Sequence, residues 1–202
     1  RYISVRDYGQ GFLVNEVRED GKTVLEAAFS VLNTSGKYRA DGTYEGTSLG
    51  SFGIGSKITT FLSHNLTVIS YRDKKFEKVL FNEGVFSNRE TGSSTEKSGT
   101  FVEWIPSEEF FTHTSIEEGK IKDLFNTISC LCPRLKIILD LDDNHYEYYS
   151  ENGINDLVDE AVKGKEIITN RFNMRYEEGK EKLDMVLTYT SNYSLTLIPY
   201  VN

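Results

Sequence analysis

The sequence predicts a mixed α/β (α+β) fold in two layers, with a largely antiparallel sheet and helices on one of its faces. Several pairs of short segments alternate apolar and polar residues, and polar turns connect the members of each pair. Between these pairs lie segments whose apolar residues recur at the three-to-four residue spacing of a helix. Because hairpins build antiparallel sheets and amphipathic helices need an apolar face to cover, the combination favours this two-layer arrangement.

The composition supports a folded domain and excludes several classes of protein. Of the 202 residues, 38% are hydrophobic and 12% aromatic, which is enough for a sizeable core. The formal net charge is −8, whereas a module that binds duplex DNA normally presents a basic face. No apolar run approaches the ~18 residues that span a bilayer. Cys130 and Cys132 lack the spacing of a zinc site, and a reducing cytoplasm is the simplest compartment.

The first half of the chain contains segments with the two-residue alternation of strands and segments with the three-to-four residue spacing of helices. A glycine- and serine-rich stretch interrupts them and is longer than an ordinary connection, which is typical of a functional segment. The predicted elements are, in order, a strand over residues 3–5, a helix over 23–32, the glycine-rich stretch over 33–56, a helix over 57–62, and a hairpin made by residues 66–71 and 76–81.

The second half of the chain also contains both predicted strands and predicted helices. Pro106 ends one predicted strand, since proline cannot donate to the next rung of a sheet. The predicted elements are a polar loop over residues 87–98, a strand over 100–105, a helix over 116–131, a hairpin made by 135–141 and 145–149, a helix over 155–162, and a last pair of strands over 183–189 and 195–201.

The first motif that suggests chemistry follows the first strand directly. Asp7, Gly9 and Gly11 form the pattern Asp-x-Gly-x-Gly. A carboxylate at this position can accept a hydrogen bond from an exocyclic amine, and the glycines let the backbone pass close to a flat ring. Taken alone, the same residues are also typical of an ordinary turn.

The second motif is a cluster of glycines before a helix. Gly50, Gly53 and Gly55 expose backbone N–H groups, and Lys57 adds a full positive charge beside the helix start. These features favour a phosphate site. The spacing is neither that of a Walker loop nor that of a Rossmann turn, and a surface loop with an exposed lysine is the alternative.

The third motif opens the strand over residues 100–105. Thr100 ends the stretch Thr-Glu-Lys-Ser-Gly-Thr, and its hydroxyl can bond to a base edge or to a bridging water. A polar turn before a strand is the alternative interpretation.

The order of these motifs resembles the ATP-binding fold, also called the Bergerat fold, of the gyrase–chaperone–histidine kinase–MutL superfamily. Within it, the chain is most similar to the B subunit of bacterial type II DNA topoisomerases, either DNA gyrase or topoisomerase IV. The stretches that carry this resemblance are ISVRDYGQG, VLNTSGKY, TEKSGTFVEWIPS, LKIILDLDD with YEYYSENGINDLV, and LTYTSNYSLTLIPYVN.

The resemblance implies an ATP site with Mg²⁺. By this likeness Asp7 receives the adenine amino group, Gly9 and Gly11 lie beside the base, and Thr100 shares the water network around it. The other positions that it implies are Lys37 and Tyr44 in the lid over the nucleotide, Gly50, Gly53, Gly55 and Lys57 around the phosphates, and Lys78 near the pocket mouth, where the family commonly has arginine.

The resemblance also implies what is missing. In the family, the glutamate that acts as general base and the asparagine that holds Mg²⁺ lie on a helix before the first strand, so both are expected before Arg1. Hydrolysis needs a base and a metal, and we therefore assign no catalytic or metal-binding residue to this chain. The expectation is one ATP-binding domain over residues 1–202, truncated before its catalytic helix, ending where a transducer domain would begin, and inactive in hydrolysis by itself.

The function that follows from the resemblance is the ATPase domain of a type II DNA topoisomerase, an isomerase that couples ATP to strand passage and to supercoiling or decatenation. The expected partners are a second B subunit, the A subunit and DNA, with little DNA contact by this domain and no membrane. Two alternatives stay open. One is a nucleotide-binding regulatory domain of the same fold without turnover, and the other is a mismatch-repair-type ATPase.

Overall fold

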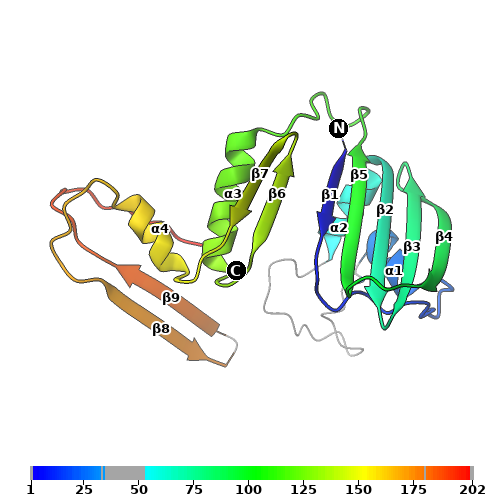
Figure 1. Cartoon of the computed structure of the whole chain (residues 1–202), viewed down its shortest axis with the longest axis horizontal. Coiled ribbons are helices and arrows are strands. Elements are labelled where there is room, and N and C mark those ends of the chain that lie inside the picture. The colour runs from blue at the N-terminus through cyan, green and yellow to red at the C-terminus, as the bar shows by residue number, and fades with distance from the viewer. Residues whose placement is uncertain (1, 33, 35–52, 180, 201–202) are drawn as a thin grey trace. The chain divides into compact units, whose positions relative to one another are not determined.

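The computed structural model describes residues 2–32, 34, 53–179 and 181–200 (Figure 1). These residues fall into two compact units, one within residues 1–115 and one within 116–201, which we call unit 1 and unit 2. The expectation of one domain over residues 1–202 stays a prediction.

Unit 1 is built on a five-stranded sheet in which each neighbouring pair is antiparallel. The strand order across the sheet is β1-β5-β2-β3-β4. The strands are β1 (Ile3–Arg6), β2 (Ser63–Arg72), β3 (Lys75–Asn82), β4 (Val85–Ser93) and β5 (Gly99–Pro106). The predicted antiparallel sheet is therefore confirmed, as are the strand at the start of the chain and the hairpin β2–β3.

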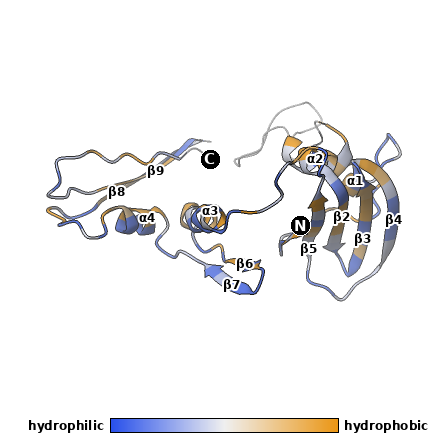
Figure 2. Cartoon of the chain, turned by 90° about the horizontal axis from the view of Figure 1, so that it is seen from above, coloured by the Kyte–Doolittle hydropathy of each residue, from blue (hydrophilic) through white to orange (hydrophobic). Residues whose placement is uncertain are grey.

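Two helices cover one face of this sheet, α1 (Val24–Ser30) and α2 (Ile54–Phe61) (Figures 1 and 2). Alternate residues of each strand point to the face that the helices cover. Four of these residues on β2 and β3 are apolar and buried. On β2 and β3, Leu66 lies opposite Phe81 and Val68 lies opposite Val79. The buried core consists of these four side chains together with Leu25 and Phe29 of α1.

The start of α1 follows from its first residues. Thr23 is the N-cap, and its Oγ1 accepts the backbone N–H of Glu26 at 3.1 Å, so one of the unpaired donors of the first turn is satisfied. The start of α2 lies earlier than predicted. Gly53 takes a left-handed backbone conformation (φ 60°) and the helix begins at Ile54, so Gly55 belongs to the helix and not to the preceding loop.

The predicted polar loop over residues 87–98 is wrong for most of its length, because residues 85–93 form β4. Among the described strands, β4 is one of the two edges of the sheet and pairs only with β3, and all nine of its residues are exposed. An edge strand is held by backbone hydrogen bonds and tolerates polar side chains on both faces. It therefore lacks the apolar alternation on which the prediction depended.

The described residues of unit 2 form two separate hairpins and two helices. Its elements are α3 (Glu118–Leu131), β6 (Ile137–Leu141), β7 (Asn144–Tyr148), α4 (Ile154–Ala161), β8 (Phe172–Glu178) and β9 (Glu181–Leu187). Both predicted helices and the first hairpin, β6–β7, are confirmed. None of the helices described in the two units is long and apolar enough to cross a membrane.

The predicted partner of the last strand is wrong. β9 pairs with β8, which precedes it, whereas residues 195–200 have no regular secondary structure. Gly179 has a φ of 60° and stands at the connection, where a left-handed residue allows a tight turn. The alternation of Phe172, Met174 and Tyr176 with polar residues is the signal that could have identified β8.

Candidate functional site

The Asp-x-Gly-x-Gly motif forms a turn that the structure fixes against the start of β5. The backbone N–H of Asp7 donates to the carbonyl oxygen of Thr100 at 2.9 Å. The Oδ1 atom of Asp7 accepts the N–H of Gly9 at 2.8 Å. No described residue donates a hydrogen bond to Oδ2, and the side chain is exposed, so the turn presents a carboxylate oxygen that a ligand can reach.

Close backbone contacts explain the glycines around this carboxylate. At Gly99, where φ is 138°, a Cβ atom would lie 2.0 Å from the carbonyl oxygen of Asp7. At Gly11, where φ is 69°, a Cβ atom would lie 2.6 Å from the carbonyl oxygen of Tyr71. Only glycine fits either position. The structure thus brings the first and third motifs together, although about ninety residues separate them in the chain.

Gly99 lies in this candidate site, although the sequence did not identify it. Its only signal was a glycine directly before the threonine that was singled out. Thr100 is buried at the beginning of β5, beside the turn that carries Asp7. Gly9 is tightly placed, because a Cβ atom there would lie 3.0 Å from Oδ1 of Asp7.

The described part of the second motif lies at the start of α2. Gly53 precedes the helix, and a Cβ atom at Gly55 would meet no atom within 4 Å, so the backbone of the first turn is open on that side. The hydroxyl of Ser56 donates to the carbonyl oxygen of Ala28 at 2.8 Å, which attaches this turn to α1. The helix start is therefore both accessible and fixed, as a phosphate site requires.

Lys57 is directed into the protein and not into open space. Its side chain is 1% exposed, and Nζ donates to the carbonyl oxygen of Thr34 at 3.4 Å. Burial lowers the pKa of this ammonium group, because removal from water disfavours the charged form. The positive charge predicted for a phosphate site thus lies beside the backbone that follows α1.

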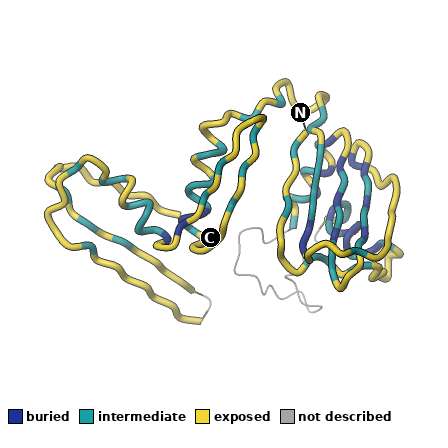
Figure 3. Tube along the Cα trace, in the orientation of Figure 1, coloured by how far each residue is buried: buried dark blue, intermediate teal, exposed yellow. Residues whose placement is uncertain are grey.

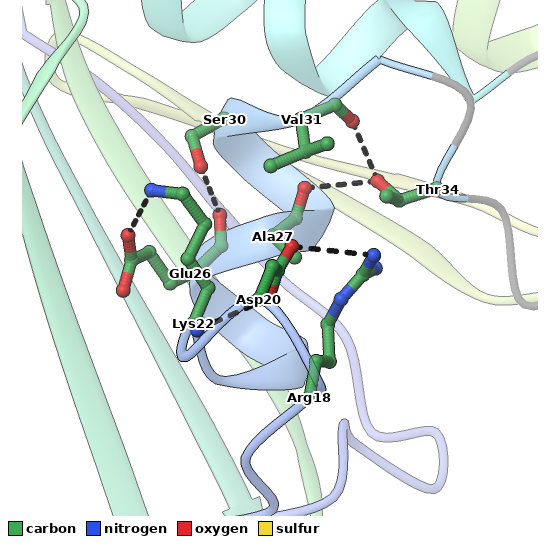
Figure 4. Close-up of polar contacts among 8 residues, drawn as sticks. All are labelled: Arg18, Asp20, Lys22, Glu26, Ala27, Ser30, Val31 and Thr34. Atoms are coloured by element: carbon green, nitrogen blue, oxygen red, sulfur yellow. Dashed lines mark hydrogen bonds and ion pairs between the residues drawn. The ribbon is translucent and has the colours of Figure 1, made fainter.

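The hydrogen bonds of Thr34 hold that backbone (Figure 4). Its Oγ1 is within hydrogen-bonding distance of two carbonyl oxygens, 2.9 Å from that of Ala27 and 2.6 Å from that of Val31. At the other end of α1, Nζ of Lys22 donates to Oε1 of Glu26 at 2.5 Å. These contacts fix both ends of α1, and through Thr34 they fix the acceptor of Lys57.

Lys78, the remaining predicted residue that the structure describes, is not brought to this place. Lys78 lies on β3 between Glu77 and Val79, which are buried on the helix-covered face, so strand alternation puts Lys78 on the other face of the sheet. Its role at the pocket mouth stays a prediction. Lys37, Tyr44 and Gly50 lie outside the described residues, and their roles stay predictions as well.

An open hollow of about 700 Å³ also lies in unit 1, lined by residues of β2 and β3, by Lys74 in the turn between them and by residues 93–96. It contains none of the predicted site residues. Among the residues that the structure describes, no three or more His, Cys, Asp or Glu side chains come together in a way that could hold a metal ion.

Comparison with known proteins identifies the relatives of this chain. No protein-family model matches. The chain is 31% identical over 200 residues to the B subunit of DNA topoisomerase 4 of Borreliella burgdorferi, a match that covers 99% of the chain and 30% of that protein. It is 30% identical over 204 residues to the same subunit of Mycoplasma capricolum, covering 99% of the chain and 31% of that protein. The chain is thus similar, over nearly its whole length, to type II topoisomerase B subunits.

Two further comparisons agree with this similarity. The DNA gyrase B subunit of Thermus thermophilus is 24% identical over 207 residues, covering 99% of the chain and 32% of that protein. The crystal structure of the 43K ATPase domain of that gyrase B, in complex with an aminocoumarin, matches with a TM-score of 0.78 at 20% identity, over 96% of the chain and 50% of the solved one. The predicted fold class is thereby confirmed. The chain spans less than a third of the length of these curated relatives.

Proposed function

We propose that this chain is the ATP-binding region of a type II DNA topoisomerase B subunit, and that ATP binds at the turn of Asp7. The observation that carries the proposal is the meeting of Asp7, Gly11, Gly99 and Thr100 at one end of the sheet, with an exposed carboxylate oxygen among them. The relatives reported above are topoisomerase subunits, which favours this function over a mismatch-repair ATPase.

The chemistry of the turn suits adenine. A carboxylate accepts a hydrogen bond from the exocyclic amine of adenine, whereas guanine carries a carbonyl oxygen at the same ring position, which the carboxylate repels. The glycines leave the backbone bare, so a flat ring can approach it closely. The buried Thr100 supplies a hydroxyl, which both donates and accepts, for a water beside the base.

The phosphates are assigned to the start of α2. Backbone N–H groups at Gly53 and Gly55 and the partial positive charge of the helix start are the features that attract a triphosphate, and the buried ammonium group of Lys57 adds positive charge from within the protein. Lys37, Tyr44, Gly50 and Lys78 complete this part of the proposal. A bound Mg²⁺ would neutralise phosphate charge, and we assign neither its ligand nor the general base for hydrolysis to a residue of this chain.

The activity of the whole protein is part of the same proposal. ATP binding and hydrolysis would drive strand passage by a complex of two B subunits, the A subunit and DNA, in the cytoplasm. The net charge of −8 is in keeping with a domain that leaves the DNA contacts to other parts of that complex. A nucleotide-binding domain without turnover has the same binding site and differs only in the fate of the ATP.

The test is a calorimetric titration with a non-hydrolysable ATP analogue in the presence of Mg²⁺. Asp7→Asn keeps Oδ1 as the acceptor for Gly9 but loses the charge. A hydrogen bond to a charged group contributes about 1.5–3 kcal/mol, so we expect roughly 10- to 100-fold weaker binding. Asp123→Asn, at an exposed position of α3, is the matched control and should bind like the wild type. Equal affinities of Asp7→Asn and the wild type would refute the adenine assignment.

A further inference from the structure

A fully buried carboxylate lies beside the candidate site. Glu77 of β3 is 0% exposed, and its side chain points to the helix-covered face of the sheet with those of Val79 and Phe81. Its cross-strand neighbour on β2 is Ser70, which is also 0% exposed. Glutamate is rarely buried completely without a partner, because removing its charge from water is costly.

The partner of Glu77 is a backbone group far away in the sequence. Oε2 accepts the N–H of Asn15 at 2.8 Å. Oε1 is also buried, and it has no hydrogen-bond partner among the described residues. Asn15 has a φ of 60°, a left-handed conformation that asparagine tolerates better than most residues. Glu77 thus holds the end of a short segment, residues 11–15, that continues directly from the Asp-x-Gly-x-Gly turn.

Two side chains of β2 hold the beginning of the same segment. The hydroxyl of Ser70 donates to the carbonyl oxygen of Phe12 at 3.0 Å. The guanidinium group of Arg72 donates through Nη1 to the carbonyl oxygen of Gly11 at 3.3 Å. Ser70, Arg72 and Glu77 therefore bind three backbone groups within residues 11–15.

The fit between this segment and β2 is tight. A Cβ atom at Gly11 would lie 2.6 Å from the carbonyl oxygen of Tyr71, 3.0 Å from that of Gly99 and 3.1 Å from Oγ of Ser70. A shift of residues 11–15 therefore moves Gly11 against Gly99, whose own position is set by its contact with Asp7. The hydrogen bond of Glu77 is in this way connected to the carboxylate that is proposed to receive adenine.

We propose that Glu77 is a positioning residue that sets the preference of the site for adenine over guanine. The inference depends on the proposed function, because it assigns a role toward ATP to a side chain that lies behind the turn. Glu77 holds Asn15, the segment over residues 11–15 keeps Gly11 against Gly99, and Asp7 stays where its carboxylate meets the exocyclic amine. Without the hydrogen bond of Glu77 to Asn15 the turn of Asp7 is less fixed, and its carboxylate discriminates less between the amine of adenine and the carbonyl group of guanine.

The experiment measures the dissociation constants of non-hydrolysable ATP and GTP analogues for wild type, Glu77→Ala, Glu77→Gln and the control Glu108→Ala, an exposed glutamate. We expect Glu77→Ala to reduce the ratio of ATP to GTP affinity about tenfold. Glu77→Gln keeps an oxygen that can accept the N–H of Asn15 and should retain most of the preference. Glu108→Ala should not change it. A purely structural role would weaken both nucleotides equally, and an unchanged ratio in Glu77→Ala overturns the inference.

A second variant covers the case in which Glu77→Ala does not fold. Ser70→Ala removes only the hydrogen bond to Phe12 and leaves a methyl group in its place, and we expect it to lower the same ratio about threefold. An unchanged ratio in Ser70→Ala would then overturn the inference. If the wild type itself shows no ATP binding, the proposed function and this inference both fail. If the wild type prefers ATP and neither variant alters that preference, only the inference fails.

Discussion

Unit 1 and the hairpin β8–β9 of unit 2 use the same alternation of apolar and polar residues with opposite results (Figure 3). In unit 1 the alternate side chains of β2 and β3 are buried beneath α1. In β8 all seven residues are exposed. The apolar residues of β8–β9 lie opposite one another in the register Phe172 with Leu187, Met174 with Met185, and Tyr176 with Leu183, and each is at least 36% exposed.

This difference shows that a strand pattern by itself does not make a core. Burial of apolar area supplies the main favourable free energy of folding, and in unit 1 the helices provide that burial. In unit 2 the described residues leave these apolar side chains of β8–β9 exposed. The candidate site therefore lies in the unit whose strands are fixed by their own core, and fixed elements position site residues best.

The largest expected effect compares two phenylalanines. Phe81→Ala removes a 1% exposed ring from the core of unit 1 and should lower the free energy of unfolding by about 3–5 kcal/mol. Phe172→Ala removes a 54% exposed ring from β8 and should lower it by less than about 1 kcal/mol. Urea titration followed by the fluorescence of Trp104, the only tryptophan, which packs against the core of unit 1, measures the first effect directly.

Circular dichroism, recorded for both variants in the same titration, follows the unfolding of unit 2, which lacks a tryptophan. Similar losses for Phe81→Ala and Phe172→Ala would contradict the contrast between the two units.

The second effect concerns Lys57. Lys57→Met replaces a buried cation by an apolar chain of similar length and should raise the free energy of unfolding by about 1 kcal/mol or more. The same variant should weaken triphosphate binding, since it removes a positive charge from the proposed site. A thermal melt and a nucleotide titration of one protein sample measure the two opposite changes. Lys122→Met, on α3 of unit 2, is the control and should change the free energy of unfolding and the affinity for the triphosphate only slightly.

The lowered pKa of Lys57 also predicts a pH dependence. The folded state binds this proton less readily than the unfolded state, whose pKa is near the ordinary 10.5. Stability should therefore rise as pH increases through the interval between the lowered folded value and 10.5. Lys57→Met should abolish that rise, and a rise of the same size in Lys57→Met would contradict the burial of this side chain.

A smaller effect compares the starts of two helices. Thr23→Ala removes the side-chain cap of α1 and should cost about 1 kcal/mol in the free energy of unfolding. The N-cap of α3 is Glu117, whose side chain makes no capping hydrogen bond, so Glu117→Ala should cost only a few tenths of a kcal/mol. Chemical denaturation followed by circular dichroism compares the two. Equal losses would mean that the cap of Thr23 contributes nothing specific.

The smallest effect lies on the exposed hairpin β6–β7. Nδ1 of His145 lies 2.6 Å from Oδ1 of Asp140, and this hydrogen bond raises the pKa of the histidine. A raised folded pKa stabilises the folded state at pH values below the unfolded pKa, and the effect is lost as pH rises through the folded pKa. An NMR titration should show a higher pKa for His145 in the wild type than in Asp140→Asn. The same pKa in both would exclude this cause.

The sequence predicted the elements whose periodicity is strong. The hairpin β2–β3 and the helix α3 were found because their apolar residues recur at a clear spacing. β4 was missed because a polar edge strand has no such pattern. The pairing of β8 with β9 was missed because the segment over residues 195–200 alternates just as β8 does, and only the turn at Gly179 decides between them.

The site was predicted in pieces. Asp7 and Thr100 were each identified from a local motif, but their direct backbone contact depends on the pairing of β1 with β5, which no local pattern specifies. Gly99 and Glu77 were missed because what distinguishes them is the approach of distant backbone. Lys57 was identified by its charge, and its burial depends on the packing of α2 against α1.

The most direct test of the proposed ATP site is an NMR titration of the isotope-labelled chain with a non-hydrolysable ATP analogue and Mg²⁺. We expect large changes in the amide signals of Gly9, Gly11, Gly99 and Thr100, smaller ones at the start of α2, and none along β8–β9. Saturating nucleotide that leaves these four amides unchanged, or that shifts the signals of β6–β7 or β8–β9 in their place, would contradict the proposed site.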